Sequence, residues 1–166
     1  MKKVFLPAKT FLLIIMGLAG AIAADAQRDN TAEIKNMVEG QRYLFVAQSA
    51  MPMSGRIRQL TPDYDFKVTK DTVVSYLPYF GQAYVAPMDP TQGGIQFTST
   101  SFDYTATPRK KGGWNISIKP KDYGDVQQIM LSISESGYAT LQVNNTNRQA
   151  ISFNGYITAI KEKRKK

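Results

Sequence analysis

From Gln41 onward, apolar and polar residues alternate with a period of two, and this alternation restricts the fold more than any other feature of the chain. Ile116 and Ile118, for example, alternate with Ser117 and Lys119. Successive side chains of a β-strand point to opposite faces, so the pattern is typical of strands with one buried and one solvated face. It predicts eight or nine short strands near residues 41–49, 63–69, 72–78, 94–99, 101–107, 113–119, 126–134, 137–144 and 150–158.

The segments between these strands are short and rich in turn residues, as in Lys111-Gly112-Gly113. Strands joined in this local way form a meander. We expect the meander to curl into a barrel or a strongly curved sheet, because a flat sheet of this width exposes two edges. The predicted fold is therefore mainly β (α+β), with one N-terminal helix on a curved antiparallel meander or barrel of eight to nine strands.

The helix is predicted just before the first strand. Asn30 and Glu33 have the spacing of a capping box, and Gly40 is expected to end the helix in a left-handed conformation. The apolar residues at helical spacing are Ile34, Met37 and Val38. A helix of about 10 residues is marginal alone, so we expect this face to pack on the sheet.

Residues 1–26 have the three parts of a secretory signal peptide: basic residues, an apolar stretch, and small residues before a cleavage site after Ala26. The apolar stretch from Phe11 to Ala23 is shorter than the ~20 residues that span a bilayer. A lipoprotein would need a cysteine after this stretch, and the chain has none. We therefore expect a monomeric exported protein, periplasmic or secreted, with no membrane span after cleavage.

The chain carries a net charge of +8, but most of this charge lies at its ends. Residues 1–26 contribute three basic and one acidic residue, and residues 161–166 contribute five basic and one acidic. The 13 basic and 11 acidic residues that remain make 27–160 nearly neutral. We expect 27–160 to form a single β-rich domain with a basic tail at 161–166, and no specific binding of nucleic acid.

The chain contains no histidine and no cysteine. This excludes Ser-His-Asp and Cys-His catalytic systems, disulfides, and ordinary zinc, haem and iron–sulfur sites. We expect no metal and no cofactor. Carboxylates are the remaining acid–base groups, but they are scattered along the chain, mostly beside turns.

Several short strings occur in an order that resembles one known family. They are Ser54-Gly55-Arg56, Leu77-Pro78-Tyr79-Phe80-Gly81, Gly94-Ile95-Gln96-Phe97, Lys111-Gly112-Gly113-Trp114, Gly137-Tyr138-Ala139-Thr140-Leu141 and Ile151-Ser152-Phe153-Asn154-Gly155-Tyr156-Ile157. Together they resemble the domain of unknown function 4251 family of exported and lipoprotein-type proteins from Bacteroidetes, over about residues 30–158. The resemblance implies export and a shared β-rich fold, and it brings no established activity or functional residue.

The most unusual stretch runs from Ser75 to Tyr84, where four aromatic residues lie close to Pro78 and Gly81. Such a stretch either forms an aromatic surface for a ligand or partner, or turns a tight corner whose rings close the core. Arg56 and Arg58 are spaced to point the same way on an extended chain, so they either clamp an anion or pair with nearby acids. The candidate surface comprises Tyr76, Tyr79, Phe80, Tyr84, Arg56 and Arg58.

These features predict a non-enzymatic domain that binds a small hydrophobic or glycan-like ligand, or an envelope protein. Two alternatives remain: a hydrolase that depends on a pair of carboxylates, and a structural component of the envelope. The sequence predicts no catalytic residue.

Overall fold

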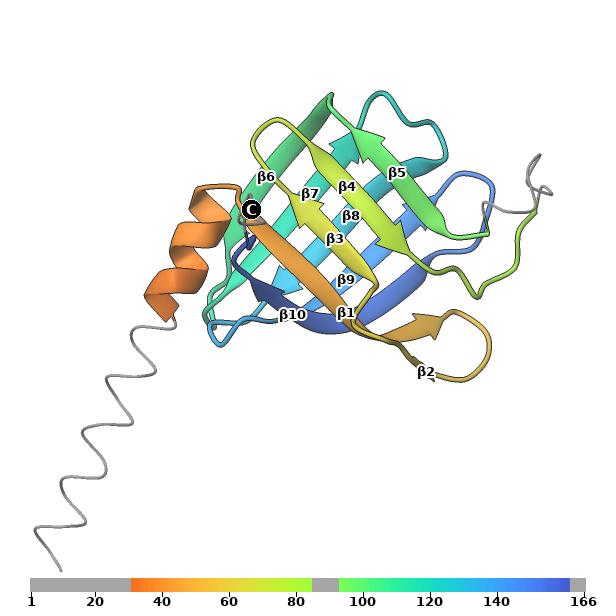
Figure 1. Ribbon diagram of the computed structural model, residues 1–166, viewed down its shortest axis with the longest axis horizontal. Coiled ribbons are helices and arrows are strands. Elements are labelled where there is room, and N and C mark those ends of the chain that lie inside the picture. The colour runs from red at the N-terminus through yellow and green to blue at the C-terminus, as the bar shows by residue number, and fades with distance from the viewer. Residues whose placement is uncertain (1–30, 85–92, 162–166) are drawn as a thin grey trace, which may run out of the picture.

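The computed structural model describes residues 31–84 and 93–161, in which ten strands form one antiparallel sheet that curls into a nearly closed barrel (Figure 1). The strands are β1 (Tyr43–Pro52), β2 (Arg58–Gln59), β3 (Asp65–Val68), β4 (Val73–Leu77), β5 (Ile95–Ser99), β6 (Phe102–Pro108), β7 (Trp114–Pro120), β8 (Val126–Ile133), β9 (Tyr138–Asn145) and β10 (Ile151–Thr158). Nine of these strands lie within three residues of the predicted segments, and the short β2 is an addition. The mainly β fold and the curved meander are confirmed.

The strand order is β5-β4-β3-β1-β10-β9-β8-β7-β6, so β1 joins two meanders. Along one edge β1 pairs with β10. Along its other edge, residues 43–46 pair with β3 and residues 49–50 pair with β2. A bulge between Ala47 and Ser49 leaves Gln48 as an extra residue on β1. Because a bulge bends and twists its strand, β1 can carry both meanders around the same core.

The two ends of this order, β5 and β6, are consecutive strands joined by a tight turn. The carboxylate of Asp122, in the loop between β7 and β8, holds this turn. It accepts hydrogen bonds from the Ser99 hydroxyl and from the backbone N–H groups of Thr100 and Ser101. These bonds, the one from Ser99 foremost, lower the pKa of Asp122 to about 2.

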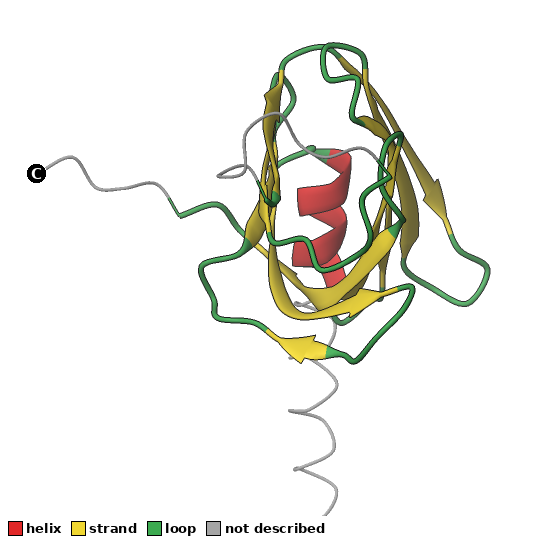
Figure 2. Cartoon of the chain, turned by 90° about the vertical axis from the view of Figure 1, so that its right-hand side faces the viewer, coloured by secondary structure: helices red, strands yellow, loops and turns green. Residues whose placement is uncertain are grey.

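A helix at residues 31–39 covers one end of the barrel. Seen from the opposite end, it lies behind the strands and within their outline (Figure 2). Ile34, Met37 and Val38 are buried in the core. The hydroxyl of Tyr104 donates to the carbonyl of Val38 at 3.2 Å and lies 3.4 Å from the hydroxyl of the fully buried Tyr43. The helix therefore packs its apolar face on the barrel, as its spacing predicts.

The helix does not end as expected, because the left-handed residue is Gln41 (φ 49°) and not Gly40. The N–H of Arg42 donates to the carbonyl of Met37 and that of Gln41 to the carbonyl of Val38. These two bonds form a Schellman motif in which Gly40 is still the last half-helical residue. Asn30, the predicted cap at the other end, lies outside the described residues.

The inward residues of the strands fill the barrel with aliphatic and aromatic side chains. Those that are fully buried include Tyr43, Phe45, Phe66, Leu77, Ile95, Ile116, Ile118, Ile129, Leu131, Ile133, Leu141 and Phe153. The side chains available for recognition are thus those on the outer face and at the barrel ends. No helix in the described part of the chain is long and apolar enough to cross a membrane.

Candidate functional site

Polar side chains form a continuous row across the outer face of five neighbouring strands. Register pairs run from Thr107 through Asn115, Ser132 and Thr140 to Asn154. We call these five residues the polar row. The alternation of the strands explains four of its members, because Asn115, Ser132, Thr140 and Asn154 each lie one position from a buried residue.

Hydrogen bonds hold four side chains of the polar row in place. The Thr140 hydroxyl donates to the Asn154 amide oxygen at 3.0 Å, and the Ser132 hydroxyl donates to the Asn115 amide oxygen at 3.2 Å. The guanidinium of Arg109, which follows β6, donates to the Ser132 hydroxyl at 3.0 Å. The row is therefore a preorganised set of donors and acceptors.

Two tyrosines lie on the same face, each two residues along its strand from a member of the polar row. Tyr138 in β9 and Tyr156 in β10 are register partners, and they are 67% and 37% exposed. Within the residues that the structure describes, the ring of Tyr138 has no stacking or cation–π partner. A large aromatic face is thus presented to solvent beside fixed polar groups.

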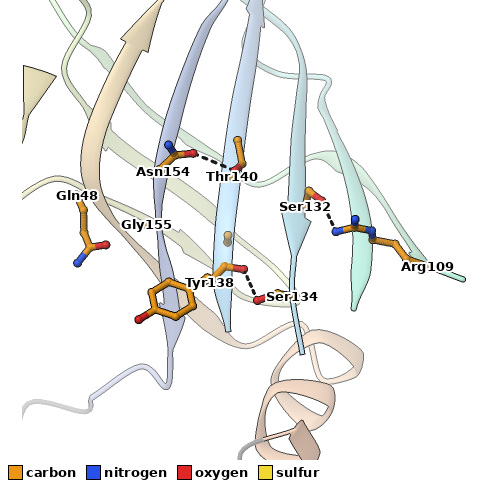
Figure 3. A pocket seen from close by; sticks show the side chains of 9 residues that line it. Gln48, Arg109, Ser132, Ser134, Tyr138, Thr140, Asn154 and Gly155 are labelled. Carbon is orange, nitrogen blue, oxygen red and sulfur yellow. Dashed lines mark hydrogen bonds between the residues drawn. The ribbon is translucent and has the colours of Figure 1, made fainter. Parts of the chain in front are cut away.

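Tyr138 and part of the polar row line an open hollow of about 310 Å³ on the outside of the barrel, which we call the outer hollow (Figure 3). Its lining consists of Gln48, Arg109, Ser132, Ser134, Tyr138, Ala139, Thr140, Asn154 and Gly155. Gln48 is present because the bulge in β1 turns it outward. The lining combines amides, hydroxyls, one aromatic ring and one cation, and it includes no carboxylate.

The aromatic residues of the stretch from Ser75 to Tyr84 are placed in different surroundings. Tyr76 is 46% exposed on β4 and stacks on Tyr64, with 5.7 Å between ring centroids. Phe80 packs partly against the core, and the guanidinium of Arg58 lies over its ring at 4.6 Å. The structure therefore brings Arg58 and Phe80 together, while Tyr76 lies in a different pair.

Residues 78–84, which we call the closing segment, are fastened to the turn between β9 and β10. The Tyr79 hydroxyl lies 2.9 and 3.0 Å from the carbonyl oxygens of Gln82 and Gln149, which share its single donated proton. The N–H of Tyr84 donates to Asn147, and that of Gln149 donates to Gln82. Burial raises the pKa of Tyr79, so its hydroxyl stays protonated as a donor.

Arg148 supports the closing segment from the same turn. Its guanidinium lies 5.1 Å from the Tyr79 ring centroid, donates to the carbonyl of Gly94 at 3.0 Å, and lies 3.7 Å from the Asp125 carboxylate. The side chain is only 13% exposed. Tyr79 and Phe80 thus serve to close this end of the barrel, which is one of the two interpretations that the sequence leaves open.

The remaining predicted residues are exposed. Tyr84 is 70% exposed, and Arg56 and Arg58 lie at the surface on either side of Ile57. Neither arginine makes an ion pair with Asp63 or Asp65 in the described structure. Burial instead raises the pKa of Asp65, partly offset by Lys67.

The sequence reasoning missed the outer hollow, although its residues carry a signal. Tyr138, Thr140 and Asn154 all lie at outward positions of strands that the alternation places well. Their grouping depends on the register between β8, β9 and β10, which is visible only once the strands are paired. Within the described residues, no group of three or more acidic side chains is arranged to hold a metal ion.

Comparisons with known proteins agree with this fold. The chain resembles the crystal structure of a DUF4251 family protein from Bacteroides eggerthii, with 17% sequence identity and a TM-score of 0.57 over 78% of this chain and 87% of that one. No curated protein matches. The model of the domain of unknown function DUF4251 matches residues 25–157. With most of its length matched, the chain belongs to the DUF4251 family, which its short sequence strings already resemble.

Proposed function

We propose that this protein is an exported, non-enzymatic domain that binds a glycan-like ligand in the outer hollow. The observation that carries the proposal is the exposed, unstacked ring of Tyr138 beside the hydrogen-bonded polar row. The C–H face of a sugar packs on an aromatic ring, and its hydroxyls exchange hydrogen bonds with amides and hydroxyls. A few fixed polar groups around an apolar surface are what a small-ligand site requires.

The lining of the outer hollow favours binding over the alternative of hydrolysis. Glycoside hydrolysis uses two carboxyl groups that flank the scissile bond. None of the nine described lining residues is Asp or Glu, and the chain has no histidine or cysteine to replace them. A purely structural envelope component, the other alternative, has no need of an exposed ring beside an ordered polar row.

The export part of the proposal rests on residues 1–26, which lie outside the described residues. Cleavage after Ala26 would give a mature protein that begins at Gln27. Mass spectrometry of the N-terminal peptide from a periplasmic or secreted fraction tests this. A protein that keeps Met1 and stays in the cytosol would contradict export and leave the binding proposal standing.

Glycan binding is tested by comparing two tyrosines of similar exposure. We expect the purified protein to retain members of an immobilised set of neutral and acidic oligosaccharides. We expect Tyr138→Ala to weaken this binding about tenfold or more through loss of the stacking face. Tyr84→Ala, which removes the 70% exposed ring of the closing segment, is the matched control and should bind as the wild type does.

Two results would contradict the proposal. If Tyr84→Ala loses binding and Tyr138→Ala keeps it, the ligand lies at the closing segment and the outer hollow is the wrong site. If the wild type retains no member of the set, glycan binding is rejected. The thermal midpoint of both variants should equal that of the wild type, since both side chains are exposed.

A second candidate function is docking of a partner protein at the closing end of the barrel. Three large apolar side chains are exposed there, Met53 (72%), Ile57 (62%) and Tyr84 (70%), in segments that the Arg58–Phe80 contact joins. Exposed apolar side chains beside arginines are typical of the centre of a protein interface. Cross-linking from an Ile57 position, with the Tyr138→Ala variant as control, separates this function from ligand binding in the outer hollow.

A further inference from the structure

We infer that the ligand of the outer hollow is an acidic sugar, a uronic acid residue of a glycan, whose carboxylate is held by Arg109. This inference rests on the proposed function and adds the chemical class of the ligand. Arg109 is the one charged side chain among the nine described residues that line the outer hollow. The charge of the site is therefore positive and is set by a single residue.

The backbone around Arg109 is fixed by the turn between β6 and β7. The N–H of Arg109 donates to the carbonyl of Gly113 at 2.9 Å, and the N–H of Gly112 donates to the carbonyl of Arg109 at 3.1 Å. Both glycines have φ near +80°, which non-glycine residues rarely adopt. A side chain at Gly113 would come within 2.1 Å of the Ile133 carbonyl oxygen, so the turn admits only glycine there.

From this fixed start, the side chain of Arg109 reaches across β7 to Ser132 on β8 (Figure 3). Ser132 accepts from the guanidinium and donates in turn to Asn115. The guanidinium is therefore positioned over the outer face by a hydrogen-bonded partner. The neighbouring Lys110 and Lys111 belong to the same turn but do not line the outer hollow.

Arg109 forms no ion pair within the described part of the chain. A guanidinium carries five N–H donors, and the contact to Ser132 occupies one side of this group. No Asp or Glu among the described residues lies within ion-pair distance of Arg109. Glu135, the acid of the adjoining turn, lies against Gly112 without forming an ion pair with Arg109.

The layout of the site suits an oligosaccharide that carries a carboxylate. Ser132, which holds Arg109, is register partner of Thr140, and Tyr138 lies two residues from Thr140 on β9. Diagonal neighbours of this kind are about 7–8 Å apart. Figure 3 shows the Tyr138 ring turned toward β10 and Arg109 approaching Ser132 from the opposite side, so the two groups lie at opposite sides of the outer hollow. One sugar of an oligosaccharide can therefore stack on Tyr138 while a neighbouring uronate extends its carboxylate to Arg109, and Thr140 and Asn154 offer hydrogen-bonding groups to the hydroxyls. One guanidinium matches one planar, singly charged carboxylate, with which it forms paired hydrogen bonds.

The test compares matched ligands on the full chain. The probes are trimers of galacturonate, glucuronate and mannuronate, each beside its carboxyl-reduced neutral form, titrated by calorimetry. We expect at least one uronate trimer to bind ten times or more tightly than its reduced form. We expect Arg109→Gln to bring this ratio to about one, and Arg109→Lys to give an intermediate ratio because an ammonium lacks the planar fork.

Lys110→Gln removes the same charge one residue away and is the matched control, for which the wild-type preference should persist. If every reduced trimer binds as well as its uronate, or if Arg109→Gln keeps the preference, the acidic-sugar inference is wrong while glycan binding stands. If no trimer of either kind binds and the immobilised glycans are not retained, both proposals are wrong. A thermal midpoint of Arg109→Gln equal to that of the wild type shows that any change reflects the site and not unfolding.

Discussion

The closing segment and the outer hollow both contain tyrosines, but they use the aromatic ring in opposite ways. In the closing segment, Tyr79 lies beneath the Arg148 guanidinium and its hydroxyl is bonded to backbone carbonyls. Phe80 is likewise covered by Arg58. In the outer hollow, the ring of Tyr138 has no such partner within the described residues and faces solvent beside polar groups.

This difference separates aromatic residues that stabilise the barrel from one that is available to a ligand. The closing segment draws the chain after β4 onto the turn between β9 and β10, so its rings cover the barrel end. The outer hollow lies on a sheet face whose backbone is already paired, so its exposed side chains, such as those of Tyr138 and Arg109, can change with little effect on the fold. Substitutions in the two regions should therefore affect different measurements.

The largest effect on stability is expected at Arg148. Arg148→Met keeps much of the aliphatic stem but removes the bond to Gly94, the approach to Asp125 and the cation over Tyr79. Because a charged, largely buried donor is lost, we expect the free energy of unfolding to fall by about 2 kcal/mol. Urea denaturation measures it.

Arg109→Met is the matched control, since it removes an exposed arginine from the outer hollow. Its free energy of unfolding should stay within about 0.5 kcal/mol of the wild type. If both variants lose the same stability, the contrast between the two regions is wrong.

A smaller effect is expected from the hydroxyl of Tyr79. Tyr79→Phe keeps the ring but leaves the carbonyls of Gln82 and Gln149 without this donor, which should cost about 1 kcal/mol. Tyr138→Phe, the same change on an exposed ring, should leave stability unchanged. Equal denaturation midpoints for Tyr79→Phe and the wild type would show that the closing segment does not depend on this bond.

The fold could be predicted from the sequence because alternation and turns are local signals. The period of two gives the faces of the strands directly, and the glycines at 112, 113 and 137 mark turns that require positive φ. The short β2 was missed because two residues are too few to alternate. Gln41 was missed because the left-handed residue of a Schellman motif is usually glycine, and Gly40 precedes it directly.

The candidate site was harder to predict because it depends on contacts between distant residues. The dense aromatic stretch attracted attention, yet its partners Gln149 and Arg148 come from a turn some 70 residues later. Tyr138 carries no such local signal, because one outward tyrosine in a strand is ordinary and the polar row beside it forms only when the strands pair. Composition indicates which residues can bind, and strand register decides which of them meet.

The smallest effect concerns Asp65, which lies beside Tyr76 in the strand register on the side of the closing segment. Burial raises its pKa, and Lys67 only partly opposes this. The folded state therefore holds the proton more tightly than the unfolded chain, so the ionised carboxylate costs stability once the pH rises above both pKa values. Asp65→Asn should stabilise the protein at pH 7 by less than about 0.5 kcal/mol, since the group is largely solvated. The gain should vanish below about pH 3.9, where the carboxyl is protonated in both states.

Denaturation curves at pH 7 and pH 3 measure the change in the free energy of unfolding. The exposed Asp63→Asn is the control for the loss of one negative charge. A loss of stability for Asp65→Asn at pH 7 would mean that attraction to Lys67 outweighs burial.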